Sequence, residues 1–380
     1  MHLAFLTSEY PHPRTEPAAG IGTSMKNMVI ELVKREVTIS LFVYNQKEDA
    51  VFTEGGIKFH LIKQRKFKLF GWYLHRKFLQ NYINKYIAVD QINAIEAPDW
   101  TGITAFMKLN CPLVIRFHGS DSYFCNLENR PQKKKNFWFE KTALDGADHL
   151  LSVSEFTAKK TSEIFNLKQE IHVIPNSVDI KMFTPKKPAH NSGTLLYFGS
   201  IIRKKGVLEL ASIFNRVHQK DPRVQLIMTG RDVADIRTGS SSRLLFEEIL
   251  TESARTQVVW KGNLSYSEVI AELQKAAVVA LPSFAEALPM TWLEAMAMEN
   301  ALVTSNIGWA KEVMIEGETG FMVHPEDHDM YAEKILKFLN DPAMAQQLGK
   351  AARQRVLEKF STEVVVEENL KFYEGIVRRI

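Results

Sequence analysis

The chain has 380 residues, of which 45% are hydrophobic and 24% charged, with 48 Lys and Arg against 44 Asp and Glu. This hydrophobic content at a net charge of only +4 excludes a mainly disordered chain. The length exceeds what one compact core usually holds, so two domains are expected.

The predicted elements begin with a strand over Leu3–Thr7. This start does not predict a signal peptide, because it lacks a basic region and Glu9 ends the apolar run. Short apolar runs then alternate with helical patterns, which is typical of parallel sheets buried on both faces. The strands predicted in the first half are Leu3–Thr7, Val37–Tyr44, Ile92–Glu96, Leu113–His118, Leu150–Val153 and His172–Ile174.

Basic residues concentrate in this first half. Residues 1–190 hold 26 Lys and Arg against 19 Asp and Glu, whereas the remainder holds 22 against 25. Two clusters, Gln64–Phe78 and Lys133–Phe139, mix these cations with aromatic residues. Such clusters are usually solvated helix faces, but they also suit a surface that rests on anionic lipid head groups or holds an anionic acceptor. No nucleic-acid-binding module is recognised.

The cysteines are too few to staple the fold. Cys111 and Cys125 are the only two, and neither has the spacing of a paired metal ligand. They indicate a reduced, cytosolic protein without structural zinc. No apolar stretch approaches the roughly 18 residues that a membrane span needs.

A linker is predicted over Pro175–Gly193, which is rich in Pro, Asn, Ser and Gly. Beyond it the alternating pattern resumes, so the fold class expected is α/β, with two doubly wound parallel-sheet domains facing across a cleft. Ligands of such sheets bind at the carboxyl ends of the strands. The strands predicted in the second half are Thr194–Phe198, Val224–Thr229, Val258–Trp260, Val278–Leu281, Ala301–Thr304 and Phe321–Val323.

The strongest chemical signal is the segment Ser283–Ala297 (SFAEALPMTWLEAMA), which follows a predicted strand. Glu286 falls in a loop, Pro289 suits the first turn of a helix, and Glu294 falls within that helix. The free N–H groups of a helix start attract phosphate, and carboxylates there can accept hydrogen bonds from sugar and ribose hydroxyls. Solvated glutamates are the alternative.

A second phosphate-type element is Leu195–Gly206 (LLYFGSIIRKKG). Its predicted strand ends at Gly199, and a basic cluster that includes Arg203 and Lys205 precedes a helix starting near Val207. A diphosphate needs fixed cations of this kind. Alone the pattern is weak, because basic loops before helices are usually solvated.

These segments resemble, in order, the landmarks of the retaining glycosyltransferases of family 4. The resemblance covers IPNSVDIKMF, YFGSIIRKKGV, LIMTG, VVWKGNLSYSEVI, LPSFAEALPMTWLEAMAM and TSNIGWAKEVMIEGETGFMV. It extends more loosely to AGIGTS, IEAPDWTG, VIRFHGSD and SVSEFTAKK in the first half. It implies the GT-B fold and the transfer of a sugar from a nucleotide diphosphate, without metal or other cofactor and with retained anomeric configuration.

The resemblance also implies domain limits. An acceptor-binding domain over residues 1–185 would be completed by a C-terminal helix over 362–380. A donor-binding domain would span residues 186–361.

The family's functional residues transfer to matching positions. Glu286, His118 and Lys205 would be catalytic: Glu286 would bind hydroxyls of the donor sugar, His118 would lie near that sugar, and Lys205 would pair with the leaving diphosphate. Glu294 would bind the ribose. The remaining donor-binding positions are Arg203, Gly22, Gly199, Ala287, Leu288, Pro289, Met290, Gly230, Arg231, Gly262, Asn263 and Leu264, of which Arg231 and Gly262–Leu264 would select the base and Gly22 would lie in a loop after the first strand.

Two departures from the family pattern stand out. The family commonly places Arg directly after the glycine matched by Gly199, where this chain has Ser200. Arg203 is expected to supply the missing charge. Ala287 replaces a frequent glycine after the first glutamate, which leaves the identity of the donor sugar open.

The function expected is a transferase that extends a cell-surface polysaccharide such as lipopolysaccharide, or a lipid-linked glycan, from a UDP-sugar or GDP-sugar. It would be cytoplasmic, with peripheral contact to the inner face of the plasma membrane. Open alternatives are a non-catalytic nucleotide-sugar binding protein and a sugar-nucleotide epimerase or hydrolase. A nicotinamide oxidoreductase is disfavoured, because Met25 stands where the third glycine of the dinucleotide fingerprint would fall.

Overall fold

The computed structural model describes residues 1–16, 20–185 and 193–378. The chain divides into two compact units. Unit 1 comprises Met1–Ser177 and Thr362–Ile380, and unit 2 comprises Val178–Ser361. The division falls inside the segment predicted as a linker, of which residues 186–192 lie outside the described residues, as do residues 17–19 and 379–380.

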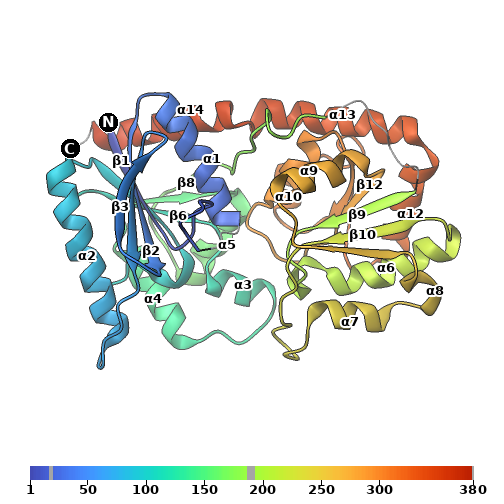
Figure 1. Cartoon of the computed structure of the whole chain (residues 1–380), viewed down its shortest axis with the longest axis horizontal. Helices are drawn as coiled ribbons and strands as arrows, with labels where there is room; N and C mark the ends of the chain where they lie inside the picture. The colour runs from blue at the N-terminus through green and yellow to red at the C-terminus, as the bar shows by residue number, and fades with distance from the viewer. Residues whose placement is uncertain (17–19, 186–192, 379–380) are drawn as a thin grey trace. The chain divides into compact units, whose positions relative to one another are not determined.

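Unit 1 is built on an eight-stranded sheet in the order β3-β4-β2-β1-β5-β6-β7-β8 (Figure 1). All its neighbouring strands are parallel except β3 and β4, which form an antiparallel hairpin at one edge. The strands are β1 His2–Thr7, β2 Thr38–Gln46, β3 Ala50–Glu54, β4 Ile57–Lys63, β5 Ala94–Pro98, β6 Leu113–Phe117, β7 His149–Ser152 and β8 Ile171–Val173.

The helices of unit 1 cover both faces of this sheet. Leu3 and Phe5 of β1 pack with α1 and α14, whereas Ala4 and Leu6 pack with α2, as expected for side chains that alternate along a strand. The helices are α1 Gly20–Lys34, α2 Gly71–Asp90, the short 3-10 helix η1 Trp100–Gly102, α3 Asp121–Leu127, α4 Lys134–Asp145, α5 Glu155–Phe165 and α14 Thr362–Val377.

Unit 2 contains a fully parallel six-stranded sheet in the order β11-β10-β9-β12-β13-β14. Its strands are β9 Thr194–Phe198, β10 Gln225–Thr229, β11 Val258–Gly262, β12 Val278–Leu281, β13 Ala301–Ser305 and β14 Phe321–Val323. Its helices are η2 Arg203–Lys205, α6 Val207–Lys220, α7 Ser242–Ile249, α8 Glu252–Arg255, α9 Tyr266–Lys275, α10 Met290–Ala297, α11 Ala310–Val313, α12 His328–Asn340 and α13 Pro342–Lys359.

The predicted α/β class and its parallel strands are confirmed, with one addition. The hairpin of β3 and β4 was not predicted, although Gly55 and Gly56 between its strands have positive φ, as tight hairpin turns require. Gly22 differs from its predicted setting, since it lies in helix α1 and not in a loop. No helix in the described ranges is long and apolar enough to cross a bilayer.

Candidate functional site

In unit 2, Lys205 and Glu286 meet at the carboxyl ends of the central strands. Lys205 ends η2, between β9 and α6, and Glu286 lies in the loop after β12. The Lys205 Nζ lies 2.9 Å from the Glu286 Oε1, and the Ser283 hydroxyl donates to the same oxygen at 3.1 Å. Both charged side chains keep some exposure, 19% and 12%, so a ligand can reach the pair.

Close packing at this edge depends on glycines. Gly199 has a φ of +127°, and a Cβ there would lie 3.7 Å from the Lys205 Nζ and 3.6 Å from the Thr291 side chain. A Cβ on Gly206 would lie 1.9 Å from the Pro282 carbonyl oxygen, so a larger residue there would displace the backbone. The end of β9 therefore lies directly beside Lys205 and the first turn of α10.

Helix α10 begins at Met290, with Pro289 at its N-cap and no side-chain capping hydrogen bond. Ala287 and Leu288 are the buried residues immediately before it. The unsatisfied N–H groups and the partial positive charge of a helix start attract anions. The start of α10 thus lies at the same edge as Lys205.

Glu294 lies one turn into α10 and is only 5% exposed. Burial raises the pKa of its carboxyl to about 7, while a hydrogen bond from the Tyr266 hydroxyl and the charge of Lys205 act in the opposite direction. The Tyr266 Oη lies 3.2 Å from the Glu294 Oε1. Tyr266 is a contact that the sequence pattern did not single out, because only the fold brings the start of α9 to this carboxylate.

The ends of β9, β10 and β11 are joined through backbone hydrogen bonds. The Gly230 N–H donates to the Gly262 carbonyl at 2.8 Å, and the Ile201 N–H donates to the Arg231 carbonyl at 2.9 Å. Asn263 and Leu264 follow β11 directly and precede α9. The residues expected to select the base therefore follow two adjacent strands of unit 2.

Arg203 has a different environment from the one expected. Its guanidinium forms two hydrogen bonds with the Asp235 carboxylate, at 2.7 and 3.0 Å. The Asp235 side chain is fully buried, and the arginine lowers the pKa of its carboxyl to about 2. Arg203 is thus committed to the loop after β10, which argues against the expectation that it replaces the arginine missing at Ser200.

In unit 1, His118 directly follows β6. Burial, with a smaller contribution from the charge of Arg116, lowers the pKa of its imidazole to about 3, so the ring is neutral at physiological pH. The His118 N–H donates to the Asp99 Oδ1 at 3.0 Å, and the other Asp99 oxygen is buried and has no hydrogen-bond partner among the described residues. Burial raises the pKa of Asp99 to about 7.

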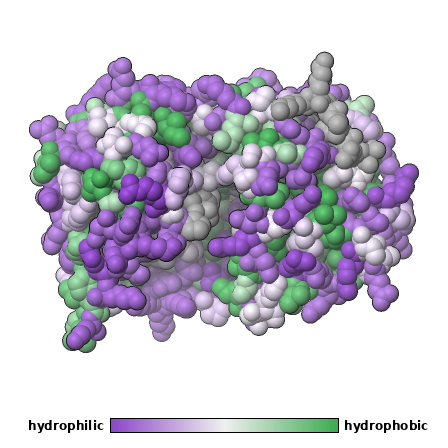
Figure 2. Space-filling model, viewed as in Figure 1, coloured by the Kyte–Doolittle hydropathy of each residue, from purple (hydrophilic) through white to green (hydrophobic). Residues whose placement is uncertain are grey.

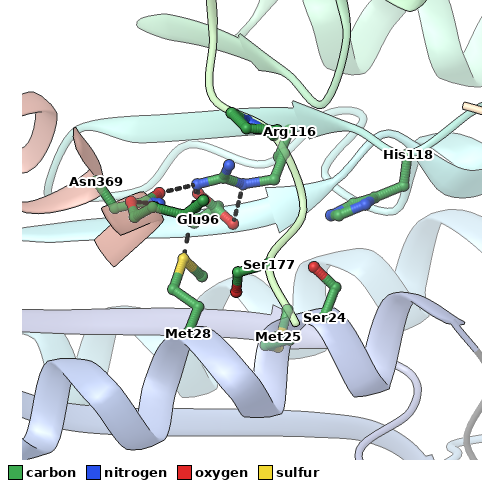
Figure 3. A pocket seen from close by; sticks show the side chains of 10 residues that line it. Ser24, Met25, Met28, Glu96, Arg116, His118, Ser177 and Asn369 are labelled. Atoms are coloured by element: carbon green, nitrogen blue, oxygen red, sulfur yellow. Dashed lines mark hydrogen bonds and ion pairs between the residues drawn. The ribbon is translucent and has the colours of Figure 1, made fainter. Parts of the chain in front are cut away.

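A small pocket beside His118 is lined by side chains from α1, the sheet and α14 (Figure 3). Arg116 and Glu96 form a buried ion pair at 2.9 Å along one wall, and Asn369 of α14 accepts a hydrogen bond from the same guanidinium. Met25 and Ser24 form the opposite wall. The charged groups of this wall are therefore already paired, and the pocket, of about 10 Å³, has room for about one water molecule.

Gly22 lies in the first turn of α1, beyond residues 17–19. Its N–H donates to the Glu9 Oε1 at 2.9 Å. Gly22 was expected to provide free N–H groups in a loop. Its N–H instead belongs to the first turn of α1 and already has the Glu9 carboxylate as its partner.

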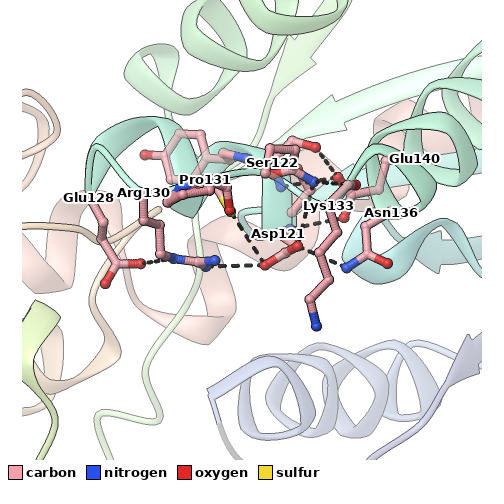
Figure 4. A network of polar contacts seen from close by, with 12 residues as sticks. Asp121, Ser122, Glu128, Arg130, Pro131, Lys133, Asn136 and Glu140 are labelled. Atoms are coloured by element: carbon pink, nitrogen blue, oxygen red, sulfur yellow. Dashed lines mark hydrogen bonds and ion pairs between the residues drawn. The ribbon is translucent and has the colours of Figure 1, made fainter. Parts of the chain in front are cut away.

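A polar network follows His118 in sequence (Figure 4). The Asp121 carboxylate accepts hydrogen bonds from Arg130 at 3.1 Å and from Asn136 at 2.9 Å. Glu140 of α4 accepts from the backbone N–H groups of Asp121 and Ser122 at the start of α3. This network fixes the segment after His118. Its members are up to 19 residues apart, so no local motif indicates it.

No cluster of three or more potential metal ligands occurs in the parts of the chain that the structure describes. The two cysteines there are both free thiols.

Comparison with known proteins identifies the family. Residues 18–181 match the family described as Glycosyltransferase Family 4, and residues 179–355 match Glycosyl transferases group 1. The alpha-maltose-1-phosphate synthase of Mycolicibacterium smegmatis is 30% identical over 262 residues, which cover 63% of this chain and 66% of the relative. The chain therefore spans just under two thirds of the length of that relative.

Solved structures agree on the fold. The sucrose-phosphate synthase of Thermosynechococcus elongatus superposes with a TM-score of 0.82 at 19% identity, over the whole of both chains. HepE of Anabaena, solved in complex with UDP, superposes with a TM-score of 0.75 at 15% identity, over 99% of this chain and all of the other. With both family models matching in succession, this chain belongs to the glycosyltransferases of family 4 and has the GT-B fold.

Proposed function

We propose that this protein transfers a sugar from a nucleoside diphosphate donor to a glycan acceptor with retention of anomeric configuration. The proposal rests on the groups that lie together at the carboxyl ends of the strands of unit 2. Lys205 and Glu286 form a partly exposed pair, helix α10 begins beside them, and Glu294 follows one turn later. Lys205 is a cation that can bind phosphate, the start of α10 provides backbone donors, and the carboxylates of Glu286 and Glu294 can accept hydrogen bonds from hydroxyl groups.

In this proposal Glu286 accepts hydrogen bonds from hydroxyls of the donor sugar, and Glu294 accepts them from the ribose. As the bond between the anomeric carbon and the diphosphate oxygen breaks, Lys205 and the start of α10 stabilise the negative charge on the leaving group. The acceptor oxygen forms the new bond to the anomeric carbon, and its proton passes to the departing diphosphate. Because fixed cations and helix N–H groups balance this charge, the step is proposed to need no metal.

Unit 1 is proposed to bind the acceptor. The neutral imidazole of His118 can exchange hydrogen bonds with a sugar hydroxyl. Asp99 holds the backbone of His118 and is proposed to keep the imidazole in position.

A lipid-linked acceptor is proposed from one surface of unit 1. The two basic aromatic clusters, distant in sequence, pack together, since the rings of Trp72 and Trp138 lie 5.9 Å apart. Leu69 and Phe70 before α2 are 74% and 70% exposed, and apolar surface gathers over this end of α2 at the lower left of Figure 2. Exposed apolar side chains among Lys and Arg suit the inner, anionic face of a plasma membrane.

The test is binding and turnover with UDP-sugars and GDP-sugars. A ligand at 100 times its dissociation constant adds about 2.7 kcal/mol to stability, which raises the melting temperature measurably. We expect stabilisation by one nucleotide class and release of that nucleoside diphosphate when a lipid-linked glycan is added. Release without any acceptor would indicate a hydrolase, and binding without release on any acceptor would indicate a non-catalytic binding protein.

A second measurement tests the membrane contact. Vesicles with 30% anionic phospholipid should sediment the protein at low salt, and a Leu69→Ser, Phe70→Ser variant should stay in the supernatant. If the parent ignores the vesicles, the proposed lipid surface is wrong, while donor binding is unaffected.

A further inference from the structure

Lys205 is one cation, whereas a nucleoside diphosphate carries at least two negative charges, so a second cation beside it would strengthen binding through further charge-assisted hydrogen bonds. We propose that Arg231, not Arg203, binds the diphosphate of the donor together with Lys205. The inference rests on the proposed function and assigns a different role to Arg231 from base selection, the role expected from the sequence.

Arg203 is excluded by its partner. Its guanidinium is bonded twice to Asp235, and the same carboxylate accepts hydrogen bonds from the Thr238 N–H and hydroxyl at 3.0 and 2.9 Å. Turning Arg203 toward a phosphate would leave a buried carboxylate without its counter-charge, which is costly. Arg203 is therefore a positioning residue that ties η2, the turn carrying Lys205, to the loop after β10.

Arg231 is placed by the register of β9 and β10. Phe198 pairs with Thr229, and Ile201 pairs with Asp232, so the same register continues through the glycines between them. Arg231 is thus the neighbour of Ser200 in the two chain segments that follow β9 and β10. The arginine that the family has at position 200 is therefore absent here, and an arginine stands instead at the paired position after the adjacent strand.

The surroundings of Arg231 fit a ligand contact. Its side chain is exposed, and within the described ranges it has neither an ion pair nor a side-chain hydrogen bond. Arg231 follows Gly230, and a Cβ added to Gly230 would lie 1.9 Å from the Gly199 carbonyl oxygen. Gly199 in turn lies beside the Lys205 ammonium. Only glycine at position 230 lets the two strand ends approach closely enough to place Arg231 at this edge. The planar guanidinium of Arg231 can donate hydrogen bonds to two phosphate oxygens at once.

The test uses inorganic pyrophosphate, which has no base, alongside UDP and GDP, each titrated calorimetrically into the full chain. We expect Arg231→Gln to weaken pyrophosphate and the preferred nucleotide by about tenfold or more, the effect of losing one charged hydrogen bond. Arg237→Gln removes an exposed arginine of the same loop and should change neither affinity. Arg203→Gln should lower the melting temperature more than Arg231→Gln does.

The outcomes separate the inference from the function on which it rests. If Arg231→Gln weakens UDP or GDP but leaves pyrophosphate unchanged, Arg231 contacts the base and the inference is wrong. It is also wrong if Arg203→Gln, with an unchanged melting temperature, is the variant that loses pyrophosphate. A parent that binds a nucleotide but not pyrophosphate contradicts the inference alone. A parent that binds none of the three contradicts the proposed function itself.

Discussion

Arg116–Glu96 in unit 1 and Lys205–Glu286 in unit 2 are ion pairs near the carboxyl ends of parallel strands, and they differ in burial and in partners. In unit 1, Arg116 and Glu96 are 5% and 2% exposed, and Tyr373 of α14 donates a hydrogen bond to the same carboxylate. In unit 2, Lys205 and Glu286 remain partly exposed beside a helix start.

The difference separates structural from ligand-binding charge. The N–H donors of the Arg116 guanidinium are used by residues of the sheet and of α14, so they are not available to a ligand. The ion pair therefore helps to hold α14 on unit 1. In the proposed function Lys205 exchanges its contact with Glu286 for a phosphate, and the exposure that both side chains keep lets a ligand reach them. The predictions below test this distinction.

Arg116→Met should have the largest effect. It leaves the Glu96 carboxylate buried without a counter-charge, and breaking such a pair costs about 3–5 kcal/mol of unfolding free energy. Urea unfolding followed by circular dichroism measures the loss. A Glu96→Met, Arg116→Met double variant should recover part of it, since no uncompensated charge remains. A loss below about 1 kcal/mol in the single variant would show that this pair is not structural.

Glu294→Gln should stabilise the protein at alkaline pH. Burial raises the pKa of Glu294 from 4.5 to about 7, so ionising it costs the folded state about 3 kcal/mol above pH 7. The cost appears only as the pH rises from about 4.5 to 7, so the advantage of the variant should shrink toward pH 5. Melting temperatures at pH 5 and pH 8.5 test this, with Glu286→Gln as the control for a more exposed glutamate. Equal melting temperatures of parent and Glu294→Gln at pH 8.5 would contradict it.

Lys205→Gln should weaken binding with little change in stability. Losing one charged hydrogen bond to phosphate costs about 1.5–3 kcal/mol, or roughly 10-fold to 100-fold in the affinity for UDP or GDP. The unfolding free energy should change by less than about 1 kcal/mol, because partly exposed pairs contribute little. Calorimetric titration and thermal melting of the same samples give both quantities. A large loss of stability with unchanged affinity would reverse the assignment.

Tyr266→Phe should have the smallest effect and should appear in a pH profile. The Tyr266 hydroxyl lowers the pKa of Glu294, so its removal raises that pKa further. If ribose hydroxyls donate to the ionised carboxylate, nucleotide affinity falls as the pH drops through about 7, and in the variant it falls at a higher pH. The hydrogen bond contributes about 0.5–1.5 kcal/mol. Titrations between pH 6 and 8.5 measure the shift, with Glu294→Gln as a reference that corrects for the phosphate's own titration. Superimposable profiles of parent and Tyr266→Phe would assign Tyr266 no part in setting this pKa.

The parallel strands and their helices were predictable because each carries its own pattern. A buried parallel strand is a short apolar run, and the six strands predicted in unit 2 coincide with β9–β14 to within two residues at each end. The hairpin of β3 and β4 was missed because neither strand is a long apolar run. β3, AVFTE, is a largely exposed edge strand, and Lys58 and His60 interrupt the apolar residues of the buried β4.

The positions of Glu286 and Glu294 relative to their loop and helix were also predictable, since Pro289 marks the start of α10. The partners of these side chains were not. Arg203 and Asp235 are 32 residues apart, and Tyr266 and Glu294 are 28 apart. Nothing in the local sequence distinguishes an arginine that faces a ligand from one that faces a buried aspartate.

The sequence by itself determined the α/β class, the order of strands and helices, and the residue types available for binding a nucleotide sugar, because these depend on local periodicity and short motifs. Only the tertiary structure decided which charges are already paired. It pairs Arg203 with the buried Asp235 and buries Arg116 against α14, whereas Lys205 and its partner Glu286 stay partly exposed and Arg231 is exposed after the carboxyl end of β10. The physical reason is that pairing and burial depend on strand register and helix packing, which bring together residues that no sequence spacing relates.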